Sequence, residues 1–243
     1  MVVVRRPSGA SIRALKTFAP EKARDCRLQL AVMMAAPRSA VIEVEPISDM
    51  SYAMPLGSPL PADAIEDMGA CYERLWAARP MRPCDRHEYH SYVFMRTLQP
   101  PTGSESEYQA ARDDVARAYN LIRDLRITQE AFVHGDATLS NALMTSDGVR
   151  LIDLSPRSAP PEIEVDIAKL MFSALGFDAH GEHARRLWNL VIKLRQKFRP
   201  DLALLRYYLA SHAVRVFLRE PPTTPELRKF YRLVSHHVNS SFQ

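Results

Sequence analysis

Residues 134–141 read His-Gly-Asp-Ala-Thr-Leu-Ser-Asn, and residues 152–155, a short way downstream, read Ile-Asp-Leu-Ser. These two stretches decide how the chain is interpreted. Asp136 directly follows the apolar run 131–133, Asn141 closes the first stretch, and Asp153 lies within the next apolar run. Three side chains with oxygen donors therefore stand next to two short segments that we predict to be buried strands.

Transfer of a phosphoryl group from ATP needs side chains of these types. A carboxylate must orient the attacking hydroxyl and accept its proton, and oxygen ligands must hold Mg²⁺ against the phosphates. Asn141 follows Asp136 at the Asp-to-Asn separation of the kinase loop H-R-D-L-x-x-x-N. A hairpin would bring Asp153 beside both. We predict that the three side chains converge, the alternative being an ordinary hairpin with polar surface residues.

The segment 131–178 resembles the aminoglycoside phosphotransferase/choline kinase family, which has the protein-kinase-like fold. The family motif H-G-D-x-x-x-x-N matches residues 134–141, and its I-D-x-[ST] strand matches residues 152–155. Residues 166–178 are similar to the pattern D-[LI]-A-K-L…S-x-x-G-[YF]-D of a branch found in bacterial capsule and surface-sugar biosynthesis.

The resemblance implies a role for each matching residue. Asp136 would be the catalytic base, and Asn141 and Asp153 would be Mg²⁺ ligands. Asp166 would support the catalytic loop, of which His134 would be a structural member. The resemblance also implies ATP as the phosphoryl donor.

Further roles are implied for the small lobe that precedes this segment. Lys16 matches the strand lysine that contacts the α- and β-phosphates of the nucleotide. Its partner on the following helix should be acidic, and Glu21 and Asp25 are both candidates. Met54 belongs to the stretch 52–57, which resembles the hinge whose backbone groups would contact adenine.

The acceptor is the least determined part of the site. Arg157 resembles an arginine of the sugar-biosynthesis branch that would hold an anionic substrate by a bidentate contact; a solvated loop arginine is the alternative. Nine basic and two acidic residues lie between positions 180 and 219. Such a surface suits a phosphorylated or acidic sugar better than a polycation, although it is also what a solvated helix face would show.

The composition and the pattern along the chain predict the architecture. The chain has 243 residues, of which 47% are hydrophobic and 25% charged, which is typical of a globular protein. Prolines cluster at residues 55–61, and helical patterns dominate after them. We expect an α+β, protein-kinase-like fold with two lobes: a reduced nucleotide lobe over residues 1–57, and a helical lobe over residues 58–243 that holds the catalytic loop and the acceptor pocket.

Other function classes are disfavoured. The eight glycines form neither G-x-G-x-x-G nor a Walker phosphate loop. No apolar stretch approaches the ~20 residues of a membrane span, and three cysteines without C-x-x-C are typical of a reducing compartment. We expect a cytoplasmic protein without a membrane partner. The net charge of +4 permits an anionic ligand without requiring nucleic acid.

We therefore expect an ATP- and Mg²⁺-dependent kinase that acts on a hydroxyl of a sugar or related metabolite. The main rival is a non-catalytic, kinase-like binding or scaffold protein. It is motivated by the fifteen residues that precede Lys16, which leave room for one hairpin with its turn at residues 7–11. That turn is either a minimal phosphate lid, or the lid is absent. Weaker alternatives are modification of a protein side chain and nucleic-acid binding through the basic C-terminal helices.

Overall fold

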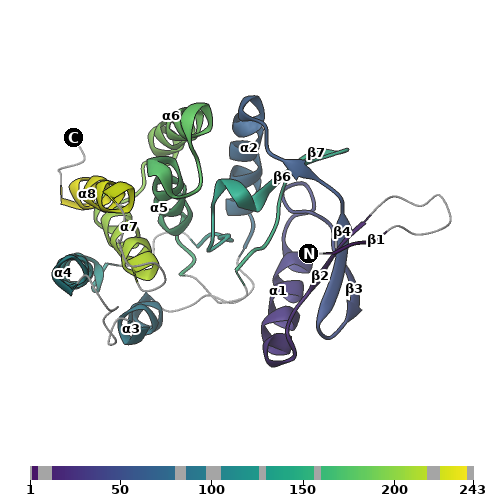
Figure 1. Cartoon of the computed structure of the whole chain (residues 1–243), viewed down its shortest axis with the longest axis horizontal. Coiled ribbons are helices and arrows are strands. Elements are labelled where there is room, and N and C mark those ends of the chain that lie inside the picture. Colours follow the sequence, from purple (N-terminus) through teal and green to yellow (C-terminus); the bar gives the residue numbers. More distant parts are fainter. Residues whose placement is uncertain are drawn as a thin grey trace.

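The computed structural model describes residues 2–4, 13–79, 86–96, 105–125, 130–155, 160–217 and 225–239. Strands and one helix form a small lobe at one end of the molecule, and a bundle of helices forms the other end (Figure 1). The N-terminus lies beside the small sheet, whereas helix α8 (Pro225–Asn239) lies on the far side of the bundle.

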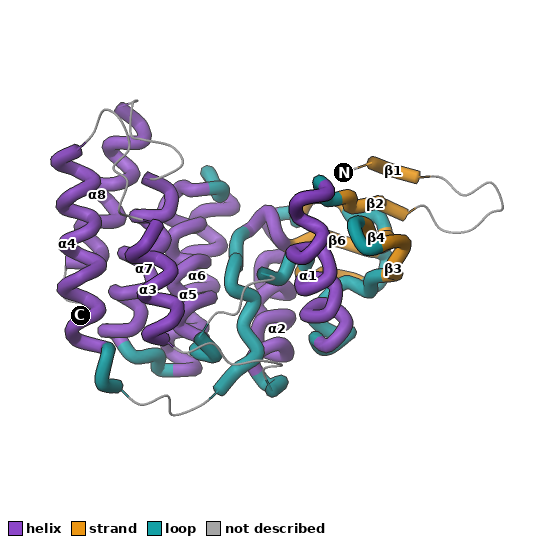
Figure 2. Tube along the Cα trace, turned by 90° about the horizontal axis from the view of Figure 1, so that it is seen from below, coloured by secondary structure: helices purple, strands orange, loops and turns teal. Residues whose placement is uncertain are grey.

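An antiparallel sheet of order β1-β2-β4-β3 forms the small lobe. Its strands are β1 (Val2–Val4), β2 (Arg13–Thr17), β3 (Glu45–Ser48) and β4 (Ser51–Pro55). Helix α1 (Ala23–Ala35) lies beside the sheet (Figure 2). Its buried residues Cys26, Gln29 and Met33 fall three and four positions apart, which places them on one helix face.

The chain changes strand partners directly after the small sheet. Strand β5 (Ser58–Pro59) pairs with β6 (Ala142–Thr145), which pairs with β7 (Gly148–Leu151). A Cβ on Gly57 would lie 2.8 Å from the Leu143 Cβ, so only glycine allows the backbone to approach β6 this closely. The lobe boundary that we predict at residue 57 falls at this change of partner.

Helices make up most of the rest of the described chain. Their bounds are α2 (Ile65–Trp76), α3 (Arg86–Arg96), α4 (Glu105–Ile122), α5 (Ile163–Phe172), α6 (Gly181–Phe198) and α7 (Leu202–Phe217). Short 3₁₀ turns occupy Pro20–Lys22, Ala62–Ala64 and Leu139–Asn141, and a π-helical turn, Ser173–Phe177, extends α5.

Helix α5 lies at the centre of the helical lobe, because α6 and α7 both pack against it. Every residue from Val165 to Phe172 is buried, as expected for a helix covered on all sides. Helix α2 packs against α6 from the direction of the small lobe, and a Cβ on Gly69 would lie 2.5 Å from the Leu190 Cδ1. Helix α5, which follows residues 134–155 in the chain, is therefore held rigidly by its neighbours.

A buried ion pair fixes the start of α5. Arg86 at the beginning of α3 contacts Glu162 with an Nε–Oε1 distance of 3.0 Å, and the Tyr208 hydroxyl donates to the same carboxylate. Arg86 also donates to the carbonyl oxygens of Ile122 and Leu125, at 2.8 and 2.6 Å. Removing one partner would strand a buried charge, at a cost of about 3–5 kcal/mol. The pair therefore joins α3, α4 and α7 to the segment before α5.

The predicted buried strand at residues 131–133 is wrong. The segment is buried, but its amides pair with two unrelated loops: Ala131 donates to the Pro161 carbonyl at 2.8 Å and Phe132 to the Ala78 carbonyl at 3.0 Å. An apolar run indicates burial, and burial alone does not select a strand ladder.

Within the described ranges, no helix combines the length and the apolar character needed to cross a bilayer.

Candidate active site

The candidate catalytic loop, residues 134–141 and called the catalytic loop below, is bonded directly to the segment that carries Asp153. The Ile152 amide donates to the Asn141 carbonyl at 2.9 Å, and the Ser155 amide donates to the His134 carbonyl at 2.8 Å. Asp153 lies between these two bonded residues, so its carboxylate is held beside the loop. The structure thus brings the three predicted oxygen donors into one region.

His134 is a buried member of this arrangement, with 1% of its surface exposed. Its Nε2 lies 2.8 Å from the Ile152 carbonyl oxygen and therefore donates to it, while its Nδ1 accepts the Asp136 amide at 3.3 Å. Both ring nitrogens are occupied by the backbone, and the ring packs beside Tyr72. This geometry suits the structural role implied for His134.

Asp136 keeps a half-exposed carboxylate at the start of the loop. Its Oδ1 lies 3.3 Å from the Lys169 Nζ, and the Asn141 Nδ2 donates to its Oδ2 at 3.3 Å. Burial raises the pKa of Asp136, but the charges of Lys169 and Arg215 outweigh burial and leave this pKa below its usual value. Asp136 is therefore ionised at neutral pH and able to accept a hydrogen bond from a hydroxyl.

Asp153 faces the small lobe. Its Oδ1 lies 2.5 Å from the Lys16 Nζ, with 25% of the lysine side chain and 32% of the aspartate side chain exposed. Its φ angle of 56° lies in the left-handed region, which is uncommon outside glycine and which Asp tolerates better than most residues. The turn at this residue aims the carboxylate at β2.

The donor set of Asn141 and Asp153 fits Mg²⁺. The Asn141 Nδ2 donates to the Asp136 carbonyl at 2.8 Å, which leaves its amide oxygen for a cation. Mg²⁺ is commonly held by one or two protein oxygens, with substrate phosphates and waters completing the shell. In the described part of the chain, no group of three or more His, Cys, Asp or Glu side chains is arranged to hold a metal.

The helix residue that contacts Lys16 is Gln29, so the expected acidic partner, Glu21 or Asp25, is wrong. The Lys16 Nζ lies 3.2 Å from the Gln29 Oε1. Glu21 belongs to the exposed 3₁₀ turn before α1, and Asp25 lies one helical turn before Gln29. The expectation is wrong because the side chain that reaches Lys16 lies on the buried face of α1, and closeness to Lys16 in the sequence does not decide which residue lies there.

Gln29 joins the small lobe to the Asp153 segment. Its Oε1 accepts the Tyr52 hydroxyl at 3.1 Å in addition to Lys16, and its Nε2 donates to the Leu154 carbonyl at 2.9 Å. Only 5% of its surface is exposed. The i, i+3, i+7 spacing of Cys26, Gln29 and Met33 was the sequence signal that could have identified it.

Met54, one of the predicted ligand-binding residues, lies apart from these contacts. Met54 lies in β4 opposite Ala14 and is buried, so its side chain belongs to the core of the small lobe. Contact between the hinge backbone and adenine stays a prediction. Arg157 lies outside the described residues.

Asp166 supports the catalytic loop through hydrogen bonds to the first residues of the loop. It is fully buried and accepts hydrogen bonds from the His134 amide at 2.8 Å, the Gly135 amide at 2.9 Å and the Trp76 Nε1 at 2.9 Å. Burial raises the pKa of Asp166, while these three hydrogen bonds oppose the rise. Gly135, with φ of 75°, gives the loop the turn that presents both amides to one carboxylate.

Two more residues of the same sequence pattern hold the far end of the loop. The Ser173 hydroxyl accepts the Leu139 amide at 3.4 Å, and the Asp178 Oδ2 accepts the Ser140 amide at 3.0 Å. Ser173 also donates to Asp178. Gly176, with φ of 119°, turns the chain back toward the loop. The sequence pattern contained Ser173 and Asp178 without indicating this role.

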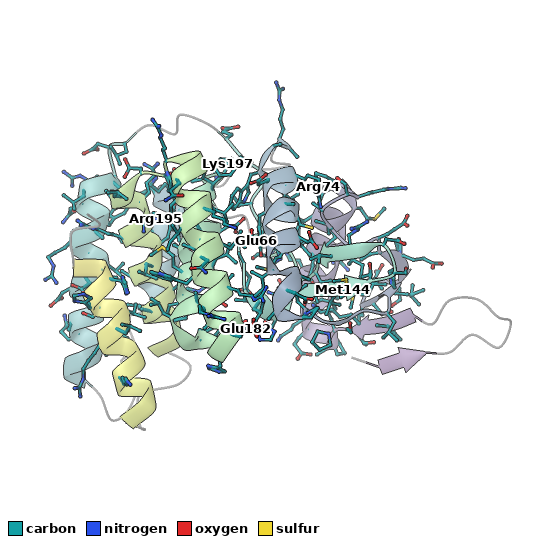
Figure 3. The ribbon with its side chains drawn as sticks, turned by 90° about the horizontal axis from the view of Figure 1, so that it is seen from above. Glu66, Arg74, Met144, Glu182, Arg195 and Lys197 are labelled. Carbon is teal, nitrogen blue, oxygen red and sulfur yellow. The ribbon has the colours of Figure 1, made fainter. Side chains whose placement is uncertain are left out.

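The basic residues of α6 are largely paired with acids. Lys193 lies 2.8 Å from Glu66, and Lys197 lies 2.7 Å from Glu73. Figure 3 shows α2 and α6 side by side, with Glu66 and Lys197 labelled on them. These exposed pairs belong to the surface between two helices. Arg215 of α7, in contrast, acts electrostatically on Asp136 and Lys169.

Comparison with known proteins finds likeness in structure alone. No family model and no curated protein matches the sequence. Choline kinase LicA from Streptococcus pneumoniae has a similar structure, with a TM-score of 0.66, 10% identity and coverage of 98% of this chain and 89% of that chain.

Two further structures are similar. A thermostable mutant of an aminoglycoside phosphotransferase gives a TM-score of 0.61 at 13% identity, over 93% of this chain and 86% of that chain. An amicoumacin kinase in complex with AMP-PNP, Ca²⁺ and Ami gives a TM-score of 0.58 at 12% identity, over 95% of this chain and 83% of that chain. The expected fold class is confirmed: this chain has the two-lobed, protein-kinase-like fold of choline kinases and aminoglycoside phosphotransferases.

Proposed function

We propose that this protein is an ATP- and Mg²⁺-dependent phosphotransferase that transfers the γ-phosphate of ATP to a hydroxyl of a small molecule. The observation that carries the proposal is the direct bonding of the catalytic loop to the Asp153 segment, together with the contact between Asp153 and Lys16. These contacts gather, at the junction of the lobes, one ionised carboxylate, two oxygen donors for a cation and one ammonium.

Each residue has a distinct task in this reaction. Asp136 orients the acceptor hydroxyl and takes its proton, and Lys16 binds phosphate oxygens of the nucleotide. Asn141 and Asp153 would hold Mg²⁺, which when bound neutralises charge on the phosphates. His134 and Asp166 keep the loop in the shape that these tasks require.

The structural neighbours support the choice of donor. They bear the names of small-molecule kinases, and one of them is described in complex with AMP-PNP and a divalent cation. The oxygen-only donor set at Asn141 and Asp153 agrees with a hard cation bound beside phosphates.

We propose a sugar or related metabolite that carries negative charge as the acceptor. Arg215 contributes positive potential at Asp136. The ring of Phe177, 39% exposed and 4.8 Å from the Lys169 Nζ, offers an apolar surface nearby. The exposed ring suits the apolar face of such a ligand, and the positive potential from Arg215 suits its anionic group.

A second candidate function is a non-catalytic, kinase-like binding protein. Gln29 supports it, because a neutral side chain stands where the expected partner of Lys16 is acidic. Among the charged groups whose contacts the structure describes, Asp153 is then the one that pairs with Lys16.

The two candidates are separated by binding and turnover. MgATP should raise the melting temperature of the wild type, and a screen of sugars, sugar phosphates and amino alcohols should reveal ATP consumption. The Asp136→Asn variant should bind MgATP and lose turnover by about 10²-fold or more. The absence of a shift at millimolar MgATP, or MgATP binding without turnover by the wild type across the screen, would favour the non-catalytic binding protein.

A further inference from the structure

Lys169 is a buried lysine whose ammonium lies at the candidate catalytic base. It belongs to α5, one helical turn after Asp166. Its Nζ lies 3.3 Å from the Asp136 Oδ1, with 10% of the lysine side chain exposed. The rings of Phe172 and Phe177 flank the ammonium, at 5.5 and 4.8 Å from the ring centroids.

This position is unfavourable for a lysine that serves only the fold. Burying an ammonium costs several kcal/mol, which a single ion pair rarely repays in full. The partner is a half-exposed carboxylate, which water screens on its open side. Elsewhere in the described chain, Lys193 and Lys197 pair on the surface, where long side chains need no burial.

The catalytic loop lacks a cation of its own. No lysine or arginine occurs in residues 134–141. During phosphoryl transfer, negative charge spreads over the oxygens of the transferring group, and neutralising that charge is most of what the protein contributes. Because Asp136 must contact the acceptor hydroxyl, a cation 3.3 Å from its carboxylate stands next to the oxygen that attacks phosphorus.

We propose that Lys169 binds the transferring phosphoryl group, giving up its contact with Asp136 for a phosphate oxygen as the acceptor hydroxyl takes its place on that carboxylate. This inference rests on the proposed function. It assigns to α5 the charge neutralisation that the catalytic loop cannot supply, and to Phe172 and Phe177 the task of holding the ammonium in place.

The step is balanced without a further reactant. The acceptor oxygen forms a bond to the γ-phosphorus, and the bond from that phosphorus to the β,γ-bridging oxygen breaks. The electron pair of the broken bond stays on the terminal oxygen of ADP. The hydroxyl proton passes to the Asp136 carboxylate, and the Lys169 charge remains +1 throughout.

The inference is tested with Lys169→Met, which keeps length and removes charge, and Lys169→Arg, which keeps charge. Lys193→Met is the matched control, since Lys193 pairs with Glu66 on the outer surface. Two readouts are used. The first is the affinity for MgADP with and without aluminium fluoride, a stand-in for the transferring phosphoryl group. The second is ATP hydrolysis in single turnover, with water as acceptor.

We expect Lys169→Met to bind MgADP as the wild type does, to lose the gain in affinity given by aluminium fluoride, and to hydrolyse ATP about 10²–10³-fold more slowly. Lys169→Arg should recover part of both, and Lys193→Met should match the wild type. If the melting curve of Lys169→Met shows that this variant is unfolded, Lys169→Arg alone decides. An unchanged gain in MgADP affinity with aluminium fluoride, together with an altered rate of ATP hydrolysis, would then contradict the inference.

Other outcomes separate the two proposals. A wild type that neither binds MgADP nor hydrolyses ATP would overturn the proposed function and this inference with it. A wild type that hydrolyses ATP in an Asp136-dependent manner, with Lys169→Met equally active, would overturn this inference alone. A Lys169→Met enzyme with normal ATP hydrolysis that fails only with anionic acceptors would also overturn it, and would place Lys169 in the acceptor subsite.

Discussion

The Lys16 Nζ and the Asp153 Oδ1 lie 2.5 Å apart although 137 residues separate them in the sequence. Lys16 belongs to β2 of the small lobe, and Asp153 follows β7 of the larger lobe. The pair therefore connects the two lobes at the point where the nucleotide phosphates and Mg²⁺ are proposed to bind.

Replacing Lys16 by Met should reduce binding far more than stability. Both side chains are partly exposed, so loss of the pair should change the free energy of unfolding by only about 0–1 kcal/mol. The affinity for MgATP should fall by about tenfold, because a charge-assisted phosphate contact is lost. Urea unfolding and titration calorimetry measure the two effects, with the exposed Lys22→Met as control. A large loss of stability with unchanged affinity would argue for a structural lysine.

Replacing Gln29 by Glu should destabilise the protein, although it restores the acidic partner expected from the sequence. A carboxylate cannot donate to the Leu154 carbonyl, which Gln29 Nε2 contacts at 2.9 Å. The carbonyl would be left unsatisfied beside a buried negative charge, at a cost of about 1–3 kcal/mol in unfolding free energy. Urea unfolding tests this, with the exposed Gln196→Glu as control. A variant more stable than the wild type would show that Lys16 prefers a charged helix partner.

Replacing Asp178 by Ala should raise the Mg²⁺ concentration needed for half-maximal ATP turnover. Asp178 accepts the Ser140 amide at 3.0 Å, directly before the proposed ligand Asn141. Residues that orient metal ligands typically contribute about 10–100-fold to metal affinity or activity. A magnesium titration of turnover measures the shift, with the exposed Asp67→Ala as control. An unchanged titration at reduced stability would limit Asp178 to supporting the fold.

Stability should decrease as the pH falls from about 6.5 to about 4, in part because of His90. Burial, and then the charge of His87, lower the pKa of His90 from 6.5 to about 4. The folded protein binds fewer protons than the unfolded chain in this window, so acidification favours unfolding. Allowing for solvent at the half-buried ring, the effect is about 1–2 kcal/mol.

His90→Gln should flatten this pH dependence of the melting temperature. The variant also loses the stacking on Tyr119 and the contact with the Tyr207 hydroxyl, so the slope against pH is the quantity to compare rather than the melting temperature itself. His236→Gln, at an exposed position of α8, is the control. An equal slope in the wild type and His90→Gln would assign the acid sensitivity to other groups, among them the buried His212, whose pKa burial also lowers.

The catalytic loop and the spacing of its residues could be predicted from the amino-acid sequence alone. Chemistry selects Asp, Asn and Asp for phosphoryl transfer, and the match at residues 134–141 and 152–155 predicted the kinase-like fold that the structure confirms. Local patterns also predicted that helices dominate after the prolines at residues 55–61, because amphipathic spacing, caps and prolines act over short distances.

Only the tertiary structure decided which residues from distant segments meet. Gln29 reaches Lys16 because it lies on the buried face of α1, and the apolar run 131–133 pairs with loops because α2 and the segment before α5 enclose it. The contacts of Ser173 and Asp178 with the catalytic loop, and of Lys169 with Asp136, likewise join α5 and its π-helical turn to a segment some thirty residues earlier. Such pairings depend on how whole helices pack, which local sequence patterns do not specify.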